Sequence, residues 1–140
     1  MAIAVKNTIR PLVINWKGFS FRVMSMRIKL DKFTATVVSV YAVTFKRPPE
    51  EKALFYNQLS EVLTAIPRLD RVFLLGDFNA RVVRDQEAWP DVVGAHGLGD
   101  INEQGTLLLE LCIRFGLCIT STCFSHADIH KGTWQHPRSK

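Results

Sequence analysis

Strand-like and helix-like segments alternate along the first half of the chain, and this alternation most restricts the folds open to it. Residues 21–30 alternate apolar and polar side chains from Met24 onward, which is typical of a half-buried strand. Residues 34–45 are rich in β-branched side chains and predict a more buried strand. Residues 71–75, "RVFLL", predict a short buried strand as well.

The segment between these last two strands, "RPPEEKALFYNQLSEVLTAIP", predicts an amphipathic helix. Pro48 and Pro49 fit a helix start, Glu50 and Glu51 complement the positive end of the helix dipole, and Pro67 ends the pattern. The helix would bury one apolar stripe. That stripe consists of Phe55, Leu59, Val62, Leu63 and Ile66.

The second half of the chain is less regular. Glycines and a proline between residues 79 and 100 predict a long loop. Asn102 can cap a second helix that Gly116 would stop, and residues 117–120 and 132–135 predict two short strands. The helix would bury Leu108, Leu111, Cys112 and Phe115. Interleaved helices and strands indicate the α/β or α+β class.

Composition limits the classes of function. A chain of 140 residues with 47% hydrophobic side chains fits one domain with one core. The formal net charge of +5 is compatible with phosphate-bearing partners, but the basic residues are scattered, which favours a solvated surface. No stretch approaches the roughly 20 apolar residues that span a bilayer, so we expect no membrane partner.

The cysteines and the N-terminus predict where the protein resides. Cys112, Cys118 and Cys123 are odd in number and form no CxxC pair, which favours a reducing intracellular compartment, nuclear or cytoplasmic. Their apolar surroundings predict that Cys112 and Cys118 are buried. The first residues lack the long apolar core of a signal peptide, so we do not expect secretion.

One motif carries chemistry: "RVFLLGDFNARV", residues 71–82. If Asp77 and Asn79 both belong to the strand, they project to the same side, and Phe78 points into the core. Gly76 permits a close backbone approach. This pair of side chains suits hydrolysis of a phosphate ester. The carboxylate can orient the attacking water, and the amide can donate hydrogen bonds to the phosphoryl oxygens. The alternative is a strand that ends in turn-forming residues.

This motif resembles the centre of the endonuclease/exonuclease/phosphatase superfamily, and "SVYAVT" resembles the strand that carries an active-site tyrosine in that superfamily. "FYNQLSEVLTAIPRLDRVFLLGDFNARV", "AWPDVVGAHGLGDINEQGTLLLELC" and "TWQHPRSK" resemble the RTE-type (BovB-like) non-LTR retrotransposon endonucleases, a lineage that includes craniofacial development protein 2-like sequences. The resemblance extends over nearly the whole chain, from about Ile3 onward. It implies a four-layer α-β-β-α sandwich of mixed β-sheets, as in DNase I-like proteins.

The resemblance also implies an activity, which is Mg²⁺-dependent hydrolysis of DNA or another phosphodiester. Asp77 matches the residue that positions the water, and Asn79 matches the residue that contacts the scissile phosphate. Tyr41 matches the tyrosine that contacts the phosphate or the attacking group. Thr133 and Trp134 match a threonine-aromatic strand near the substrate groove.

Further candidate residues have weaker support from the sequence. Arg81 and Arg84 follow the Gly76–Asn79 tetrapeptide and would either contact a DNA backbone or keep the surface soluble. Trp89 and Trp134 would either stack on bases or pack in the protein. Two further groups have the spacing or charge to hold a cation, but the sequence argues against a zinc site in the first and favours a solvated acidic loop for the second. They are His126, Asp128 and His130, and Asp85, Glu87 and Asp91.

The same resemblance implies parts that these 140 residues do not match. The superfamily's metal-binding glutamate falls upstream of the matched region, and its aspartate-histidine pair falls downstream of "HPRSK". The metal ligands are therefore unknown, and we expect a truncated endonuclease domain with impaired catalysis. Val43 replaces the proline that usually follows Tyr-Ala and removes a rigid turn residue. The alternatives are a non-catalytic module that binds nucleic acid or a protein, and a product without a selected role.

Overall fold

The computed structural model describes residues 1–82, 85–97 and 100–125. The chain forms two compact units, Met1–Asn79 and Ala80–Lys140, and each is described by itself. The elements of the first unit are a 3-10 helix (Arg10–Leu12), β1 (Val13–Gly18), β2 (Val23–Lys29), β3 (Thr34–Tyr41), α1 (Pro49–Thr64) and β4 (Arg71–Asp77). Those of the second unit are α2 (Glu103–Phe115) and a 3-10 helix (Thr120–Thr122). That the chain is one domain stays a prediction.

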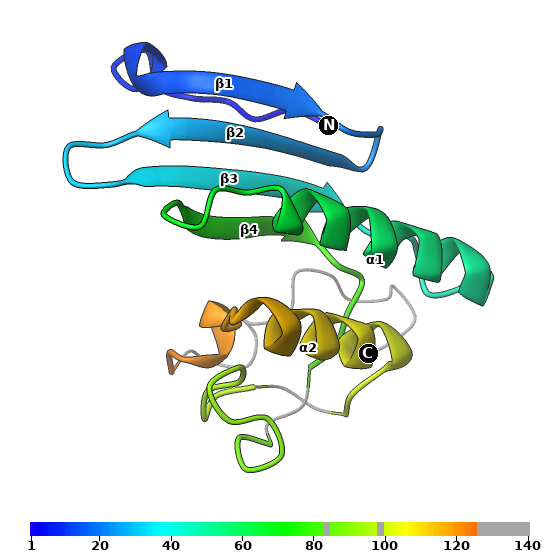
Figure 1. Ribbon diagram of the computed structural model, residues 1–140. Coiled ribbons are helices and arrows are strands. Elements are labelled where there is room, and N and C mark those ends of the chain that lie inside the picture. The colour runs from blue at the N-terminus through cyan, green and yellow to red at the C-terminus, as the bar shows by residue number, and fades with distance from the viewer. Residues whose placement is uncertain (83–84, 98–99, 126–140) are drawn as a thin grey trace, which may run out of the picture. The chain divides into compact units, whose positions relative to one another are not determined.

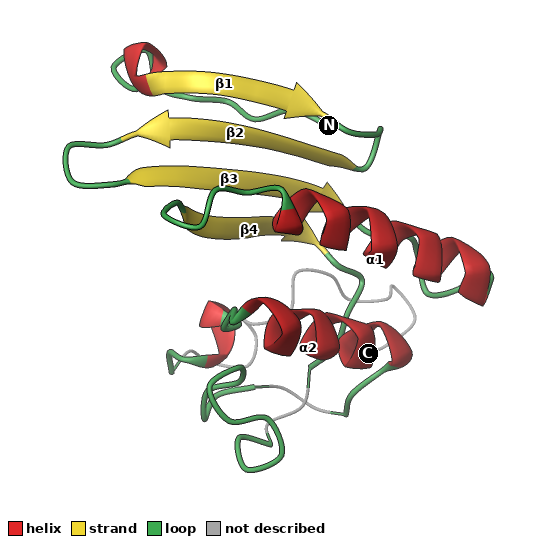
Figure 2. Cartoon of the chain, in the orientation of Figure 1, coloured by secondary structure: helices red, strands yellow, loops and turns green. Residues whose placement is uncertain are grey.

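The four strands form one mixed sheet in the order β1-β2-β3-β4 (Figure 1). The pairs β1-β2 and β2-β3 are antiparallel, whereas β3 and β4 are parallel and are connected through α1 (Figure 2). A parallel pair needs a long crossover, and the amphipathic helix predicted at this place supplies it. The mixed sheet with two helices confirms the predicted α+β class and is consistent with part of an α/β sandwich.

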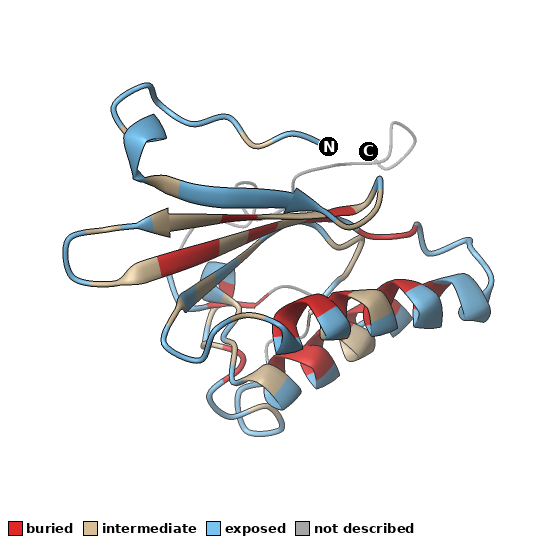
Figure 3. Cartoon of the chain, turned by 45° about the horizontal axis from the view of Figure 1, so that its top comes forward, coloured by how far each residue is buried: buried red, intermediate tan, exposed pale blue. Residues whose placement is uncertain are grey.

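The core of the first unit lies between this sheet and α1. Strand register places Thr36, Val38 and Val40 on one face, and all three are buried. Helix α1 lies against the sheet, with buried residues along its length (Figure 3). The Ser20 hydroxyl donates a hydrogen bond of 2.9 Å to Gln58 Oε1 and fastens the helix to the β1–β2 turn. The predicted apolar stripe of α1 is confirmed, except that its last member is only half-buried.

A cluster of polar side chains lies at the end of the sheet where β4 begins. The Arg27 guanidinium donates two hydrogen bonds to the Asp70 carboxylate, Nε to Oδ2 at 2.7 Å and Nη2 to Oδ1 at 3.0 Å. The Thr36 hydroxyl donates a third, to Asp70 Oδ2 at 2.6 Å. The Asp70 side chain is only 3% exposed. The hydrogen bond from Arg27 holds the pKa of Asp70 below its ordinary value.

This cluster predicts a pH-dependent stability. A carboxyl whose pKa is lower in the folded state stabilises the fold above its unfolded-state pKa, about 4 for aspartate. That stabilisation disappears as the pH falls through the lower folded-state pKa. We expect Asp70→Asn to lower the urea midpoint at pH 6 and to reduce the fall of that midpoint between pH 6 and pH 3. Asp31→Asn, in the exposed β2–β3 turn, is the matched control; an Asp70 variant that behaves like it would contradict the prediction.

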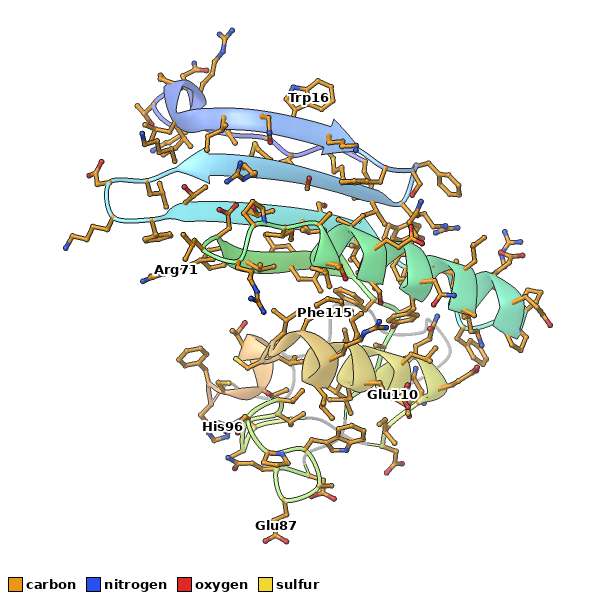
Figure 4. All side chains as sticks on the ribbon, viewed as in Figure 1. Trp16, Arg71, Glu87, His96, Glu110 and Phe115 are labelled. Carbon is orange, nitrogen blue, oxygen red and sulfur yellow. The ribbon has the colours of Figure 1, made fainter. Side chains whose placement is uncertain are left out.

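Two strands differ from the sequence-based expectations. Strand β1 was not predicted, because its outward-facing side chains, including Trp16, give no buried pattern (Figure 4). Strand β4 is not buried as predicted: Phe73 is 47% and Leu75 is 54% exposed. The reason is that these two side chains project from the face opposite Val38, and β4 lies at the edge of the sheet that the described residues form.

In the second unit, helix α2 begins and ends as predicted. Asn102 Oδ1 accepts hydrogen bonds from the backbone N–H groups of Gly105, at 2.8 Å, and Arg81, at 2.9 Å. Gly116 ends the helix in the left-handed conformation, with φ of 62°. The predicted strand at residues 117–120 is wrong, because Ile119 forms only an isolated bridge before a 3-10 turn. Residues 132–135 lie outside the described residues.

The cysteine prediction is half confirmed. Cys112 is buried, and burial raises the pKa of its thiol to about 11. Cys118 is exposed, so its predicted burial is wrong; it follows the end of α2 instead of lying on the apolar face of the helix. Neither α-helix in the described part of the chain is long and apolar enough to cross a membrane.

Candidate active site

Two of the predicted site residues meet at one edge of the sheet. Strands β3 and β4 run parallel and end at Tyr41 and Asp77, which are register partners. Paired residues on adjacent strands project to the same face, and adjacent strands lie about 4.8 Å apart. The structure therefore places the tyrosine and the aspartate side by side, both exposed, although they are far apart in the sequence.

Asn79 joins this edge through a turn rather than through the strand. Strand β4 ends at Asp77, and Asn79 has a left-handed backbone with φ of 48°. Its backbone N–H donates to Asp77 Oδ1 at 2.9 Å, and its side-chain Nδ2 donates to the Ala42 carbonyl oxygen at 3.1 Å. The prediction that strand alternation aligns the two residues is wrong, because the chain turns after Asp77. Phe78 is accordingly half-buried, not in the core.

Gly76 makes this arrangement sterically feasible. Its φ is 145°, a conformation that side-chain-bearing residues rarely adopt. A Cβ atom at this position would lie 2.8 Å from the Val40 carbonyl carbon and closer still to the oxygen of that carbonyl. The prediction of a close backbone approach is confirmed. Because Gly76 pairs with Val40 directly before the Tyr41–Asp77 pair, its conformation determines where Asp77 emerges from the sheet.

A basic residue that the sequence did not indicate completes this edge. Arg22 donates from Nη1 to the carbonyl oxygens of Tyr41, at 3.1 Å, and Ala42, at 3.4 Å. Its guanidinium carbon lies 5.5 Å from the centre of the Tyr41 ring. No motif surrounds Arg22, since its place depends on the pairing of β2 with β3, so no sequence signal was available. The edge thus combines a carboxylate, an amide, a phenol and a guanidinium.

The remaining predicted residues lie in the second unit or outside the described residues. The Arg81 side chain is exposed in the second unit. The residues that lie outside the described ranges are Arg84, His126, Asp128, His130, Thr133 and Trp134.

The acidic loop of Asp85, Glu87 and Asp91 is exposed, and Asp85 caps a local turn by accepting from the Ala88 N–H at 2.9 Å. Among residues 1–82, 85–97 and 100–125, no group of three or more His, Cys, Asp or Glu side chains is placed to hold a metal ion.

Comparison with known proteins shows similarity to two mammalian proteins named craniofacial development protein 2. The one from Bos taurus is 34% identical over 137 residues, which are 98% of this chain and 23% of the relative. The one from Tragulus javanicus is 31% identical over 137 residues, 98% of this chain and 24% of the relative. The chain thus spans about a quarter of the length of these relatives, and the predicted resemblance to them is confirmed. No family model matches the chain.

Proposed function

We propose that these 140 residues form part of a Mg²⁺-dependent phosphodiesterase domain, a DNA endonuclease of the endonuclease/exonuclease/phosphatase type, close to the RTE-type retrotransposon endonucleases. The observation that carries the proposal is the parallel pairing of Tyr41 with Asp77, with Asn79 fastened to the adjacent Ala42. The sequence resemblance assigns these residues to one site, and their proximity at one sheet edge supports that assignment.

The proposed roles follow from the chemistry of the three side chains. Asp77 is exposed, and Oδ1 accepts from the Asn79 backbone, which fixes the orientation of the carboxylate toward an attacking water. The Tyr41 hydroxyl and the Asn79 amide offer donors for phosphoryl oxygens. Fixed donors of this kind stabilise charge that develops on the phosphate without reorganising during the reaction.

The metal part of the proposal rests on the resemblance alone. Mg²⁺ prefers carboxylate oxygens and water as ligands, and it neutralises the phosphoryl charge during hydrolysis. Among the described residues, no group of three or more His, Cys, Asp or Glu side chains is placed to hold a metal ion, and Asp77 alone would be a poor Mg²⁺ site. We therefore leave the metal ligands unassigned and propose that the 140-residue chain alone is catalytically impaired.

The test is Asp77→Asn, which removes one negative charge next to the proposed phosphate position. In EDTA, we expect this variant to bind duplex DNA about threefold more tightly, because a carboxylate near a phosphate repels it. With Mg²⁺, we expect both the unaltered chain and the variant to nick supercoiled plasmid weakly or not at all. Fluorescence anisotropy and gel electrophoresis of the plasmid measure the two outcomes.

Asp31→Asn is the matched control, because Asp31 is an exposed aspartate in the turn at the other end of β3. Equal DNA affinities of the two variants would contradict the placement of a phosphate near Asp77. Strong nicking that Asp77→Asn abolishes would support the site and show that the proposed impairment is wrong.

A non-catalytic module that binds nucleic acid is the second candidate. The net charge of +5 and the exposed edge around Arg22 favour it. Salt-dependent DNA binding that is indifferent to Asp77→Asn, without cleavage, would favour this module over the endonuclease domain.

A further inference from the structure

We infer that Arg22, together with the rings of Phe21 and Tyr41, forms a nucleotide-contact subsite beside Asp77. In this subsite the Arg22 guanidinium binds a backbone phosphate next to the scissile one, and the Phe21 ring stacks on an unpaired base. The inference rests on the proposed function, since it extends the same sheet edge to a neighbouring nucleotide.

The first support is the stacking geometry. The Arg22 guanidinium carbon lies 4.8 Å from the centre of the Phe21 ring and 5.5 Å from the centre of the Tyr41 ring. Phe21 is 77% exposed, so its ring is accessible to a ligand. Cation–π contacts orient the guanidinium plane, and the outer side of an exposed ring remains accessible to a stacking base.

The second support is the link to the candidate active site. Arg22 Nη1 donates to the Ala42 carbonyl oxygen at 3.4 Å, and the same oxygen accepts from Asn79 Nδ2 at 3.1 Å. The Arg22 backbone carbonyl accepts from the Tyr41 N–H at 2.9 Å. These hydrogen bonds hold the positive charge of the Arg22 guanidinium at the end of β3, which is paired with Asp77. The position is thus fixed before any ligand binds, which lowers the entropy cost of binding.

The third support is the charge of Arg22, which no described carboxylate balances. Arg27 pairs with Asp70 at 2.7 Å and Arg47 with Glu51 at 3.6 Å, whereas no described Asp or Glu lies within ion-pair distance of Arg22. Within the described residues, the only hydrogen-bond acceptors of the Arg22 guanidinium are the two carbonyls bound by Nη1. The other N–H groups of a guanidinium match the oxygens of a phosphate.

Together, the guanidinium that would bind a phosphate and the exposed Phe21 ring define the class of ligand. An inorganic anion would use Arg22 but not Phe21, and a paired base inside a duplex offers no face to the ring. A DNA strand with unpaired bases uses both, because each base has a face that stacks on an aromatic side chain. The subsite therefore predicts a preference for single-stranded or locally opened DNA near the scissile position.

The experiment measures binding of fluorescent single-stranded and duplex oligonucleotides to the 140-residue chain in EDTA, by anisotropy at several NaCl concentrations. Arg22→Gln keeps an amide N–H for the two carbonyls but removes the charge. We expect this variant to bind DNA about fivefold more weakly. We also expect the slope of the logarithm of its binding constant against the logarithm of the salt concentration to be smaller by about one. Phe21→Ala is expected to weaken single-strand binding about fivefold and duplex binding little. Thermal melts check that each variant keeps its fold.

Arg68→Gln is the matched control, because Arg68 is exposed and lies just before the start of β4, whereas Asp77 lies at the end of that strand. Equal losses for Arg22→Gln and Arg68→Gln, or equal losses on both DNA forms for Phe21→Ala, would overturn the subsite. If the subsite is overturned but Asp77→Asn still tightens DNA binding, the proposed function stands without the subsite. If Arg22→Gln weakens binding but Asp77→Asn changes nothing, the subsite stands and the endonuclease assignment fails. Binding that is absent or independent of salt overturns both.

Discussion

Gly76→Ala is expected to lower the free energy of unfolding by more than about 3 kcal/mol. The new Cβ would overlap the Val40 carbonyl, which is backbone and cannot rotate away, and the φ of 145° is unfavourable for alanine. Strands β3 and β4 would have to separate, or β4 would have to change its path before Asp77. Urea unfolding followed by circular dichroism measures the loss.

Gly18→Ala provides the matched comparison, since Gly18 also lies in a strand but a Cβ there would meet nothing within 4 Å. We expect its free energy of unfolding to change by no more than about 0.5 kcal/mol. If the two variants unfold at the same urea concentration, the close approach of Gly76 to Val40 does not exist in solution. Because the same approach positions Asp77 beside Tyr41, that result would also remove the structural basis of the candidate site.

Leu59→Ala is expected to destabilise the protein by about 2–5 kcal/mol. Leu59 is 0% exposed at the centre of the buried stripe of α1, so truncation removes apolar contacts and leaves a cavity. Leu54→Ala in the same helix is the control, because Leu54 is 71% exposed and its loss should cost no more than about 0.5 kcal/mol. The difference between the two urea midpoints reports how much the burial of Leu59 stabilises the fold.

A small difference between the Leu59 and Leu54 variants would mean that α1 does not pack on the sheet as described. That outcome would matter for function as well as for stability. Helix α1 connects β3 to β4, and the parallel pairing of these strands brings Tyr41 to Asp77. A helix that does not pack would leave the register of β4, and therefore the site, without support.

Sequence reasoning found the elements whose signals are local. The stripe of α1, the β-branched run of β3, the Asn102 cap and the Gly116 stop each follow from a few neighbouring residues, and the structure contains all of them. It missed β1 and misjudged the burial of β4. Both lie at the edges of the sheet that the described residues form, and most of their side chains are exposed, so neither strand shows a clear buried pattern.

For the candidate site too, some features followed from the sequence and others only from the structure. The sequence by itself determined that Asp77, Asn79 and Tyr41 are the residues to examine, through a motif and its resemblance, and that Gly76 permits a close approach. Only the tertiary structure decided that Asn79 reaches the site from a left-handed turn, and that Arg22 stands beside it. The physical reason is that strand register and turn conformation bring together residues distant in sequence, and no local pattern records such contacts.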